Sequence, residues 1–163
     1  MQTEILFSEI QKMGDYSIVI LLCVINILFI YLLAKGFKTK SRVYLLATTV
    51  GFIIAISTTL LTLNLKLYTE IRKDGVYVKL FPLQLKFKHY NWMDISKAYV
   101  RTYQPVADYG GWGLKGSEHN AAINVSGNIG LQLVFKNEDK LLIGTNQPKE
   151  LTQALNKLEK YKN

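Results

Sequence analysis

Residues 43–65 read VYLLATTVGFIIAISTTLLTLNL, 23 residues without one charged side chain. A helix of that length is about 34 Å long, enough to cross the roughly 30 Å hydrocarbon core of a bilayer. Residues 17–34, SIVILLCVINILFIYLLA, form another uncharged run that is about 27 Å long as a helix. A core helix of a soluble protein carries a polar face, and neither run has one. The sequence therefore predicts a transmembrane hairpin with spans over 17–34 and 43–65.

The spans contain little that would conduct a solute. Asn26 and Asn64 are their only strongly polar side chains, which argues against a transporter or a channel. Small side chains recur every four residues in the second span, at Ala47, Gly51, Ala55 and Thr59. Such a face lets another helix approach closely. We expect it to pack against the first span of the same chain, with a dimer contact as the alternative.

The charges that flank the spans do not decide which way the hairpin faces. Lysine and arginine favour the cytoplasmic side of a membrane. The connector carries Lys35, Lys38, Lys40 and Arg42, and the segment after the second span carries Lys66, Arg72, Lys73 and Lys79. Because two spans place these segments on opposite sides, the two signals conflict. The only cysteine, Cys23, lies in the first span, so no disulfide forms within one chain.

Residues 1–16, MQTEILFSEIQKMGDY, do not resemble a signal peptide, because acidic residues stand where a basic start is required. Apolar residues in this segment fall at helical spacing. They predict a short interfacial helix that leads into the membrane, with a frayed terminus as the alternative.

The period of the sequence changes to two from residue 66 onward. Alternation predicts seven strands in 66–163: LYTEIRK, VYVKLF, LQLKFK, SKAYVRTYQ, AAINVS, LQLVFK and KLLIG. Asp74-Gly75 is expected to supply the positive φ angles of a tight hairpin turn. Pro148 and an apolar stripe then predict a helix over 148–161. We therefore expect an α+β membrane protein, in which the transmembrane hairpin precedes a seven-stranded antiparallel barrel capped by this helix.

A resemblance to a known group supports this architecture. Trp92, Asp94 and Ile95 form a W-x-D-I segment, followed by the blocks DYGGWGLK, NVSGNIGLQLVF and LLIGTNQPKEL. These blocks resemble uncharacterised bacterial two-span membrane proteins that carry a pleckstrin-homology-like domain. The resemblance implies a scaffold for binding or oligomerisation. We expect the chain in the bacterial inner (cytoplasmic) membrane and favour the cytoplasmic side for the soluble domain, although the flanking charges leave the orientation unresolved. It implies no reaction, and the basic residues of phosphoinositide binding have no match here.

The glycine-rich stretch 108–116, DYGGWGLKG, is the candidate functional loop. One interpretation is a wide turn whose tryptophan folds back over the rim of the barrel. In the other, Tyr109 and Trp112 enter the membrane interface and Lys115 contacts headgroup phosphate. Capture of a ligand by the backbone amides of Gly110, Gly111 and Gly113 is a third.

Charge agrees with a membrane surface as partner. From residue 66 onward, 15 lysine and arginine residues oppose 9 acidic ones. Lys79, Lys86 and Lys88 are predicted to share one solvent face that lies over anionic lipid, or to be a solvated face without a partner. Nucleic acid is not expected as a partner, because the aromatic residues form no stacking pattern.

The sequence offers little for catalysis. His89 and His119 are the only histidines, neither stands at metal-ligand spacing, and no nucleophile motif occurs. We expect no enzyme, no metal and no cofactor. The predicted role is a membrane-anchored, non-enzymatic binding or scaffolding module for lipid headgroups, a partner protein or a second copy. The alternative is a structural subunit of a membrane complex that assembles through its helices.

Overall fold

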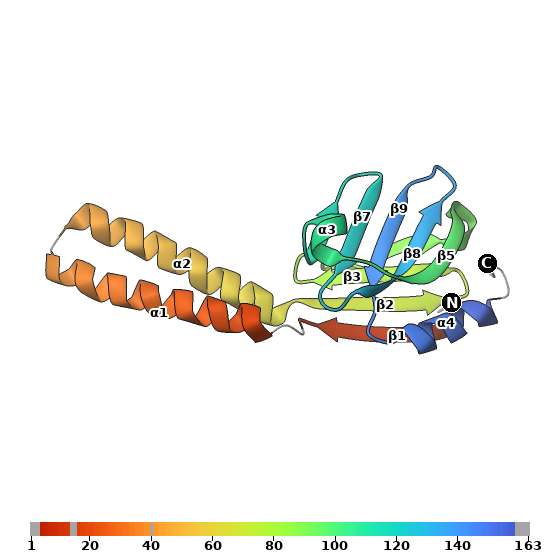
Figure 1. Ribbon diagram of the computed structural model, residues 1–163, viewed down its shortest axis with the longest axis horizontal. Coiled ribbons are helices and arrows are strands. Elements are labelled where there is room, and N and C mark those ends of the chain that lie inside the picture. The colour runs from red at the N-terminus through yellow and green to blue at the C-terminus, as the bar shows by residue number, and fades with distance from the viewer. Residues whose placement is uncertain (1–3, 14–15, 40, 159–163) are drawn as a thin grey trace. The chain divides into compact units, whose positions relative to one another are not determined.

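The computed structural model describes residues 4–13, 16–39 and 41–158, and the chain divides into two compact units (Figure 1). One unit, here the helical hairpin, comprises the described residues of 15–64. The other, here the sandwich, combines the segment before the hairpin with everything from Leu65 onward. The sandwich is therefore discontinuous in sequence, and the hairpin is inserted between its first two strands.

The hairpin consists of α1 (Tyr16–Thr39) and α2 (Arg42–Asn64), both long and apolar enough to cross a membrane. Thr48, Ala55 and Thr59 are the buried residues of α2. The Asn26 side chain donates hydrogen bonds to the Thr59 hydroxyl at 2.7 Å and to the Leu22 carbonyl at 2.7 Å. A polar side chain in the middle of an apolar helix is thus engaged by the neighbouring helix and by its own backbone.

The first sheet of the sandwich is antiparallel in the order β1-β2-β3-β4. Its strands are β1 (Ile5–Lys12), β2 (Lys66–Arg72), β3 (Gly75–Phe81) and β4 (Lys88–Asn91). Lys12 pairs with Lys66, which pairs in turn with Phe81. This register places Lys12, Lys66 and Phe81 side by side at one end of the sheet.

The second sheet has the order β5-β8-β9-β7-β6 and is antiparallel except between β7 and β9. Its strands are β5 (Ile95–Thr102), β6 (Gly113–Gly116), β7 (Asn120–Asn124), β8 (Ile129–Phe135) and β9 (Lys140–Gly144). A 3-10 turn, η1 (Trp92–Asp94), leads into β5, and the short helix α3 (Pro105–Tyr109) follows it. The last described element is the helix α4 (Pro148–Lys157).

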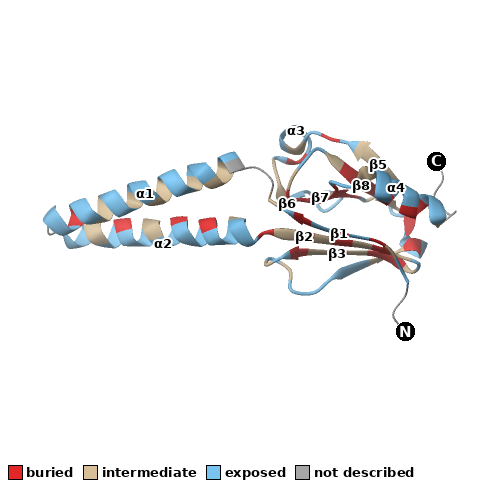
Figure 2. Ribbon diagram, turned by 90° about the horizontal axis from the view of Figure 1, so that it is seen from below, coloured by how far each residue is buried: buried red, intermediate tan, exposed pale blue. Residues whose placement is uncertain are grey.

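The core lies between the two sheets, and the strands of both layers carry buried residues, which are red in Figure 2. Leu67, Val78 and Leu80 from the first sheet share this core with Leu131 and Ile143 from the second, all with no exposed surface. Helix α4 packs against β5 and β1 and adds three buried side chains, Leu151, Ala154 and Leu155. Burial of apolar surface on this scale is the main force that holds the layers together.

The sequence-based architecture is confirmed in outline and corrected in detail. The chain is α+β, with two long apolar helices and a later helix that packs on the sheets. The predicted seven-stranded barrel is wrong, because the described residues form nine strands in two separate sheets and no closed barrel. Two of the extra strands are β1, before the hairpin, and β6, inside the glycine-rich stretch.

The predicted interfacial helix over residues 1–16 is wrong for residues 5–12, which form β1. The hydrophobic pattern misleads here, because β1 turns polar side chains inward. Glu9 and Gln11 are buried, whereas Ile10 is exposed. The Glu9 carboxylate accepts hydrogen bonds from the Thr145 hydroxyl at 2.7 Å and from the Asn146 amide at 2.8 Å. Buried polar groups are tolerated when they are paired in this way.

The hairpin of β2 and β3 forms as predicted, but its turn lies at residues 73–74 and Gly75 does not have a positive φ. A side chain at Gly75 would clash instead with the Tyr90 carbonyl, 2.3 Å from its Cβ position. The predicted strand LQLKFK is also wrong, because residues 82–87 form a loop. Gln84 closes this loop on Leu80, with its amide donating to the Leu80 carbonyl at 2.7 Å and its side chain accepting from the Leu80 amide at 3.0 Å.

Candidate functional site

The glycine-rich stretch 108–116 folds back onto its own sheet. Gly110 ends α3 in the left-handed conformation, and residues 113–116 form the edge strand β6. The half-buried Trp112 donates from Nε1 to the Gly127 carbonyl at 3.3 Å. The amide of Gly113 donates to the Asn124 side chain at 2.9 Å. The geometry agrees with the interpretation as a wide turn whose tryptophan folds back onto the sheet. Gly111 is partly exposed and Lys115 is fully exposed.

Tyr109 does not face solvent, contrary to the membrane interpretation of this stretch. Only 6% of its surface is exposed, and its ring lies in a small second core with Tyr103, Ala122 and Leu142. Its hydroxyl accepts from Arg101 at 3.1 Å. Burial also raises the pKa of Tyr103, whose hydroxyl accepts from the Asn124 side chain at 3.0 Å. These tyrosines support the fold of the second sheet.

The three lysines predicted to share one face do not share it. Lys88 pairs with the buried Val78, so its side chain leaves β4 on the inner side of the sheet. Lys79 is next to Val78 in sequence and leaves on the outer side, where its ammonium lies 4.4 Å from the ring centroid of Tyr68. Lys86 lies in the loop 82–87. The basic residues therefore contribute to two different surfaces.

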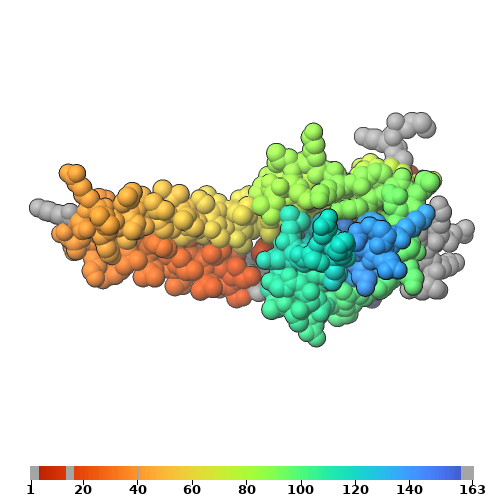
Figure 3. Space-filling view, turned by 90° about the horizontal axis from the view of Figure 1, so that it is seen from above, coloured from red at the N-terminus to blue at the C-terminus, as the bar shows by residue number. Residues whose placement is uncertain are grey.

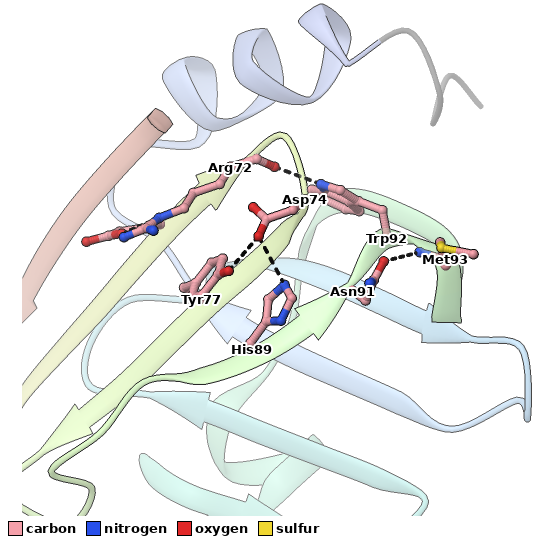
Figure 4. A network of polar contacts seen from close by, with 8 residues as sticks. Arg72, Asp74, Tyr77, His89, Asn91, Trp92 and Met93 are labelled. Atoms are coloured by element: carbon pink, nitrogen blue, oxygen red, sulfur yellow. Dashed lines mark hydrogen bonds and ion pairs between the residues drawn. The ribbon is translucent and has the colours of Figure 1, made fainter. Parts of the chain in front are cut away.

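A polar cluster lies near the turn between β2 and β3 (Figure 4). The Asp74 carboxylate accepts from the Tyr77 hydroxyl at 2.6 Å and lies 3.8 Å from Nε2 of His89. The rings of Tyr77 and His89 stack with centroids 4.3 Å apart. On the other side, Arg72 lies over the Tyr77 ring at 4.4 Å. The contacts join β2, β3 and β4 and brace the hairpin.

The candidate site is an open cleft of about 560 Å³ at one edge of the sandwich. Its apolar floor consists of Tyr90, Ala121, Phe135 and Leu141, which come from both sheets. The rings of Tyr90 and Phe135 lie 5.7 Å apart, and burial raises the pKa of Tyr90. Around this floor stand seven polar or charged residues: Lys88, Asp94, Glu118, Lys136, Asn137, Asp139 and Lys140.

The charges around the cleft are mixed and largely unengaged. Asp139 is occupied, because it meets Nδ1 of His119 at 2.7 Å and accepts from Asn137 at 2.6 Å, and the His119 contact lowers its pKa. Among the described residues, the other three lysines and two acids form no side-chain ion pair with one another. The cleft thus offers both cationic and anionic groups to a ligand above an apolar floor.

No group of three or more histidine, cysteine, aspartate or glutamate side chains in the described part of the chain is placed to hold a metal ion. His119 is 82% exposed on its side chain and already faces Asp139. What the cleft can do chemically is bind a ligand through charge and apolar contact.

Residues 2–158 match a family model described as "Family of unknown function (DUF6141)". The chain belongs to this family. The match includes both apolar helices and nearly all of the sandwich, so the hairpin and the two sheets are features of one DUF6141 chain. No curated protein and no solved structure gives a match.

Sequence reasoning missed the cleft of this DUF6141 chain and the exposed loop beside it. The residues that line the cleft come from β4, η1, β7, β8, β9 and the turns beside them. Because these elements are separated in sequence, no local motif predicts the cleft. Residues 82–87 alternate between apolar and polar side chains, which is typical of a strand, and the sequence therefore predicts a strand where the structure has a loop. Its apolar side chains in fact face solvent, and Leu85 is 78% exposed.

Proposed function

We propose that the chain is a membrane-anchored, non-enzymatic binding module, and that the cleft is its ligand site. The observation that carries the proposal is the cleft itself, where uncompensated lysines and acids surround an aromatic floor. Pockets with an apolar lining and a few converging polar groups are the usual form of small-molecule sites. The two apolar helices support attachment to a bilayer.

The cleft suits a headgroup that carries both signs of charge. Lys136 and Lys140 are placed to bind a phosphate, and Glu118 on the β6–β7 loop to bind an ammonium group. Charge-assisted hydrogen bonds of this type are stronger than neutral ones. A phosphoethanolamine headgroup has both charges within the dimensions of such a cleft, so we propose a phospholipid headgroup of this class as the ligand.

The finer assignment of the fold is part of the same proposal. Two packed sheets with a C-terminal helix against one side of the core support a pleckstrin-homology-like relationship, although the strands do not close into a barrel. We further propose that the chain belongs to a bacterial inner membrane, with the sandwich in the cytoplasm. The alternative, a structural subunit joined through its helices, loses support because Gly51, Ala55 and Thr59 face α1 of the same chain.

Titration calorimetry on the full chain in detergent tests the ligand site, with glycerophosphoethanolamine as the probe. We expect saturable binding that is weakened by Lys140→Gln and by Glu118→Gln. The matched control is Lys149→Gln, an exposed lysine on α4 outside the cleft. Equal heats for all four proteins, or no saturable heat at all, would contradict the proposal.

A further inference from the structure

The loop 82–87 exposes large apolar side chains to solvent. Leu83 is 52% exposed and Leu85 78%, while Phe81 and Phe87 at its two ends are each 36% exposed. Around residues 80–90 the yellow-green atoms project from the surface of the sandwich (Figure 3). Contiguous exposed apolar groups mark interaction surfaces more often than single ones do.

The loop is held in this outward conformation by specific contacts. Gln84 closes it through two hydrogen bonds to the Leu80 backbone. Phe87 meets Tyr68 edge-on, with ring centroids 6.4 Å apart, and the Lys79 ammonium lies 4.7 Å from the Phe87 ring centroid. These contacts hold Phe87 on the outer face of the sheet, and the two leucines before it are exposed.

The register of the first sheet puts this loop at a particular end. Lys12, Lys66 and Phe81 lie side by side across β1, β2 and β3. Lys12 is the last residue of β1 before the hairpin, and Leu65 alone separates the end of α2 from Lys66. The loop therefore starts at the end of the sheet where the chain runs into its two apolar helices.

The charge of the segment is suited to a lipid surface. Lys79 contacts Phe87 on the outer face of the sheet, Lys86 lies within the loop, and residues 75–93 contain no acidic residue. Basic side chains beside exposed leucine and phenylalanine are typical of segments that enter the boundary of an anionic bilayer. Lysine stems also lie along apolar surface while their ammonium groups reach headgroup phosphate.

From these observations we infer that the loop 82–87 inserts Leu83 and Leu85 into the anionic leaflet next to the helices, as a second membrane contact. The inference rests on the membrane anchoring in the proposed function and not on the cleft. Insertion of the loop would restrain the sandwich against the bilayer and would determine which edge of the sandwich faces lipid.

Spin labelling of the full chain in nanodiscs tests this contact. In a Cys23→Ser background, one label is attached at Leu85→Cys and another at Lys149→Cys, an exposed position on α4 outside the cleft. Collisions with oxygen report lipid, and collisions with a water-soluble nickel complex report solvent. The discs contain phosphatidylcholine alone or mixed with phosphatidylglycerol, and urea unfolding followed by tryptophan fluorescence verifies that each variant is folded.

We expect the label at 85 to favour oxygen and the label at 149 to favour nickel. Lys86→Gln should shift the label at 85 toward solvent in the discs with phosphatidylglycerol. Incorporation into discs with both labels equally exposed to nickel would overturn the inference and leave the proposed anchoring intact. Failure of the folded chain to enter discs would overturn both.

Discussion

Replacing Glu9 by alanine should weaken the attachment of β1 to the segment between β9 and α4. Glu9 is 4% exposed and accepts two hydrogen bonds, from the Thr145 hydroxyl at 2.7 Å and the Asn146 amide at 2.8 Å. A hydrogen bond to a charged group contributes about 1.5–3 kcal/mol, so two bonds give an upper value near 6 kcal/mol. Removing the buried charge also removes its desolvation cost, and we therefore expect a loss of about 3 kcal/mol.

The assay is urea unfolding of the full chain in detergent, followed by tryptophan fluorescence. Trp92 and Trp112 are the only tryptophans and both belong to the sandwich, so the signal reports this unit. With a urea slope of about 2 kcal/mol per M, a loss of 3 kcal/mol lowers the midpoint by about 1.5 M. Thr145→Val removes one of the two donors to Glu9. The loss of stability in the double variant should therefore be smaller than the sum of the losses in Glu9→Ala and Thr145→Val.

Glu4→Ala is the matched control. Glu4 forms an ion pair with Lys73 in which both side chains are exposed, and such pairs contribute little to stability because solvent screens them. If Glu9→Ala shifts the midpoint no more than Glu4→Ala does, β1 is not docked as described. Strict additivity of Glu9→Ala and Thr145→Val would refute the hydrogen bond between them.

Three further predictions follow from other parts of the molecule. Gly51→Leu should lower the thermal stability of the hairpin, because a Cβ at this position would lie 2.4 Å from the Phe29 ring. Val50→Leu, on the exposed side of α2, should leave the stability unchanged, and thermal unfolding followed by circular dichroism in detergent compares the two variants. Trp92→Phe should cost about 1–2 kcal/mol through loss of the 2.8 Å bond from Nε1 to the Arg72 carbonyl, and an unchanged urea midpoint would contradict this. Burial raises the pKa of Tyr90 and Tyr103, so these phenols stay protonated in the folded state while their unfolded counterparts ionise near pH 10. Stability should therefore fall as the pH rises above about 10, and the fall should be smaller in Tyr103→Phe, as urea midpoints at several alkaline pH values would show.

The sequence predicts those elements whose side-chain pattern is set by their own surroundings. The apolar runs at 17–34 and 43–65 lie within α1 and α2 apart from the last residue, and β2, β3, β5, β7, β8 and β9 occur near their predicted positions. The helix from Pro148 ends four residues before the expected 161 among the described elements. In each case the local periodicity and the buried face agree.

Other elements are decided by distant contacts that no local pattern contains. In β1 two of the three inward positions are polar, Glu9 and Gln11, and they are accepted because Thr145, Asn146 and the Gly144 carbonyl come from the far end of the chain. In the loop 82–87 the strand-like alternation is overridden by the local bonds of Gln84 to Leu80. The cleft depends on how two sheets meet, and this is a property of packing between elements distant in sequence.

We propose that the chain crosses the membrane twice and builds one sandwich from the segments before and after the crossing. This proposal is tested most directly by single cysteines at Ser8, Lys38 and Asn137 in a Cys23→Ser background, exposed in β1, α1 and the β8–β9 turn. Intact cells are treated with a membrane-impermeant thiol reagent, and then permeabilised cells. Positions 8 and 137 should react alike and position 38 in the opposite way, with protection of 8 and 137 placing the sandwich in the cytoplasm. Opposite behaviour of positions 8 and 137, or the same behaviour at all three, would contradict the account.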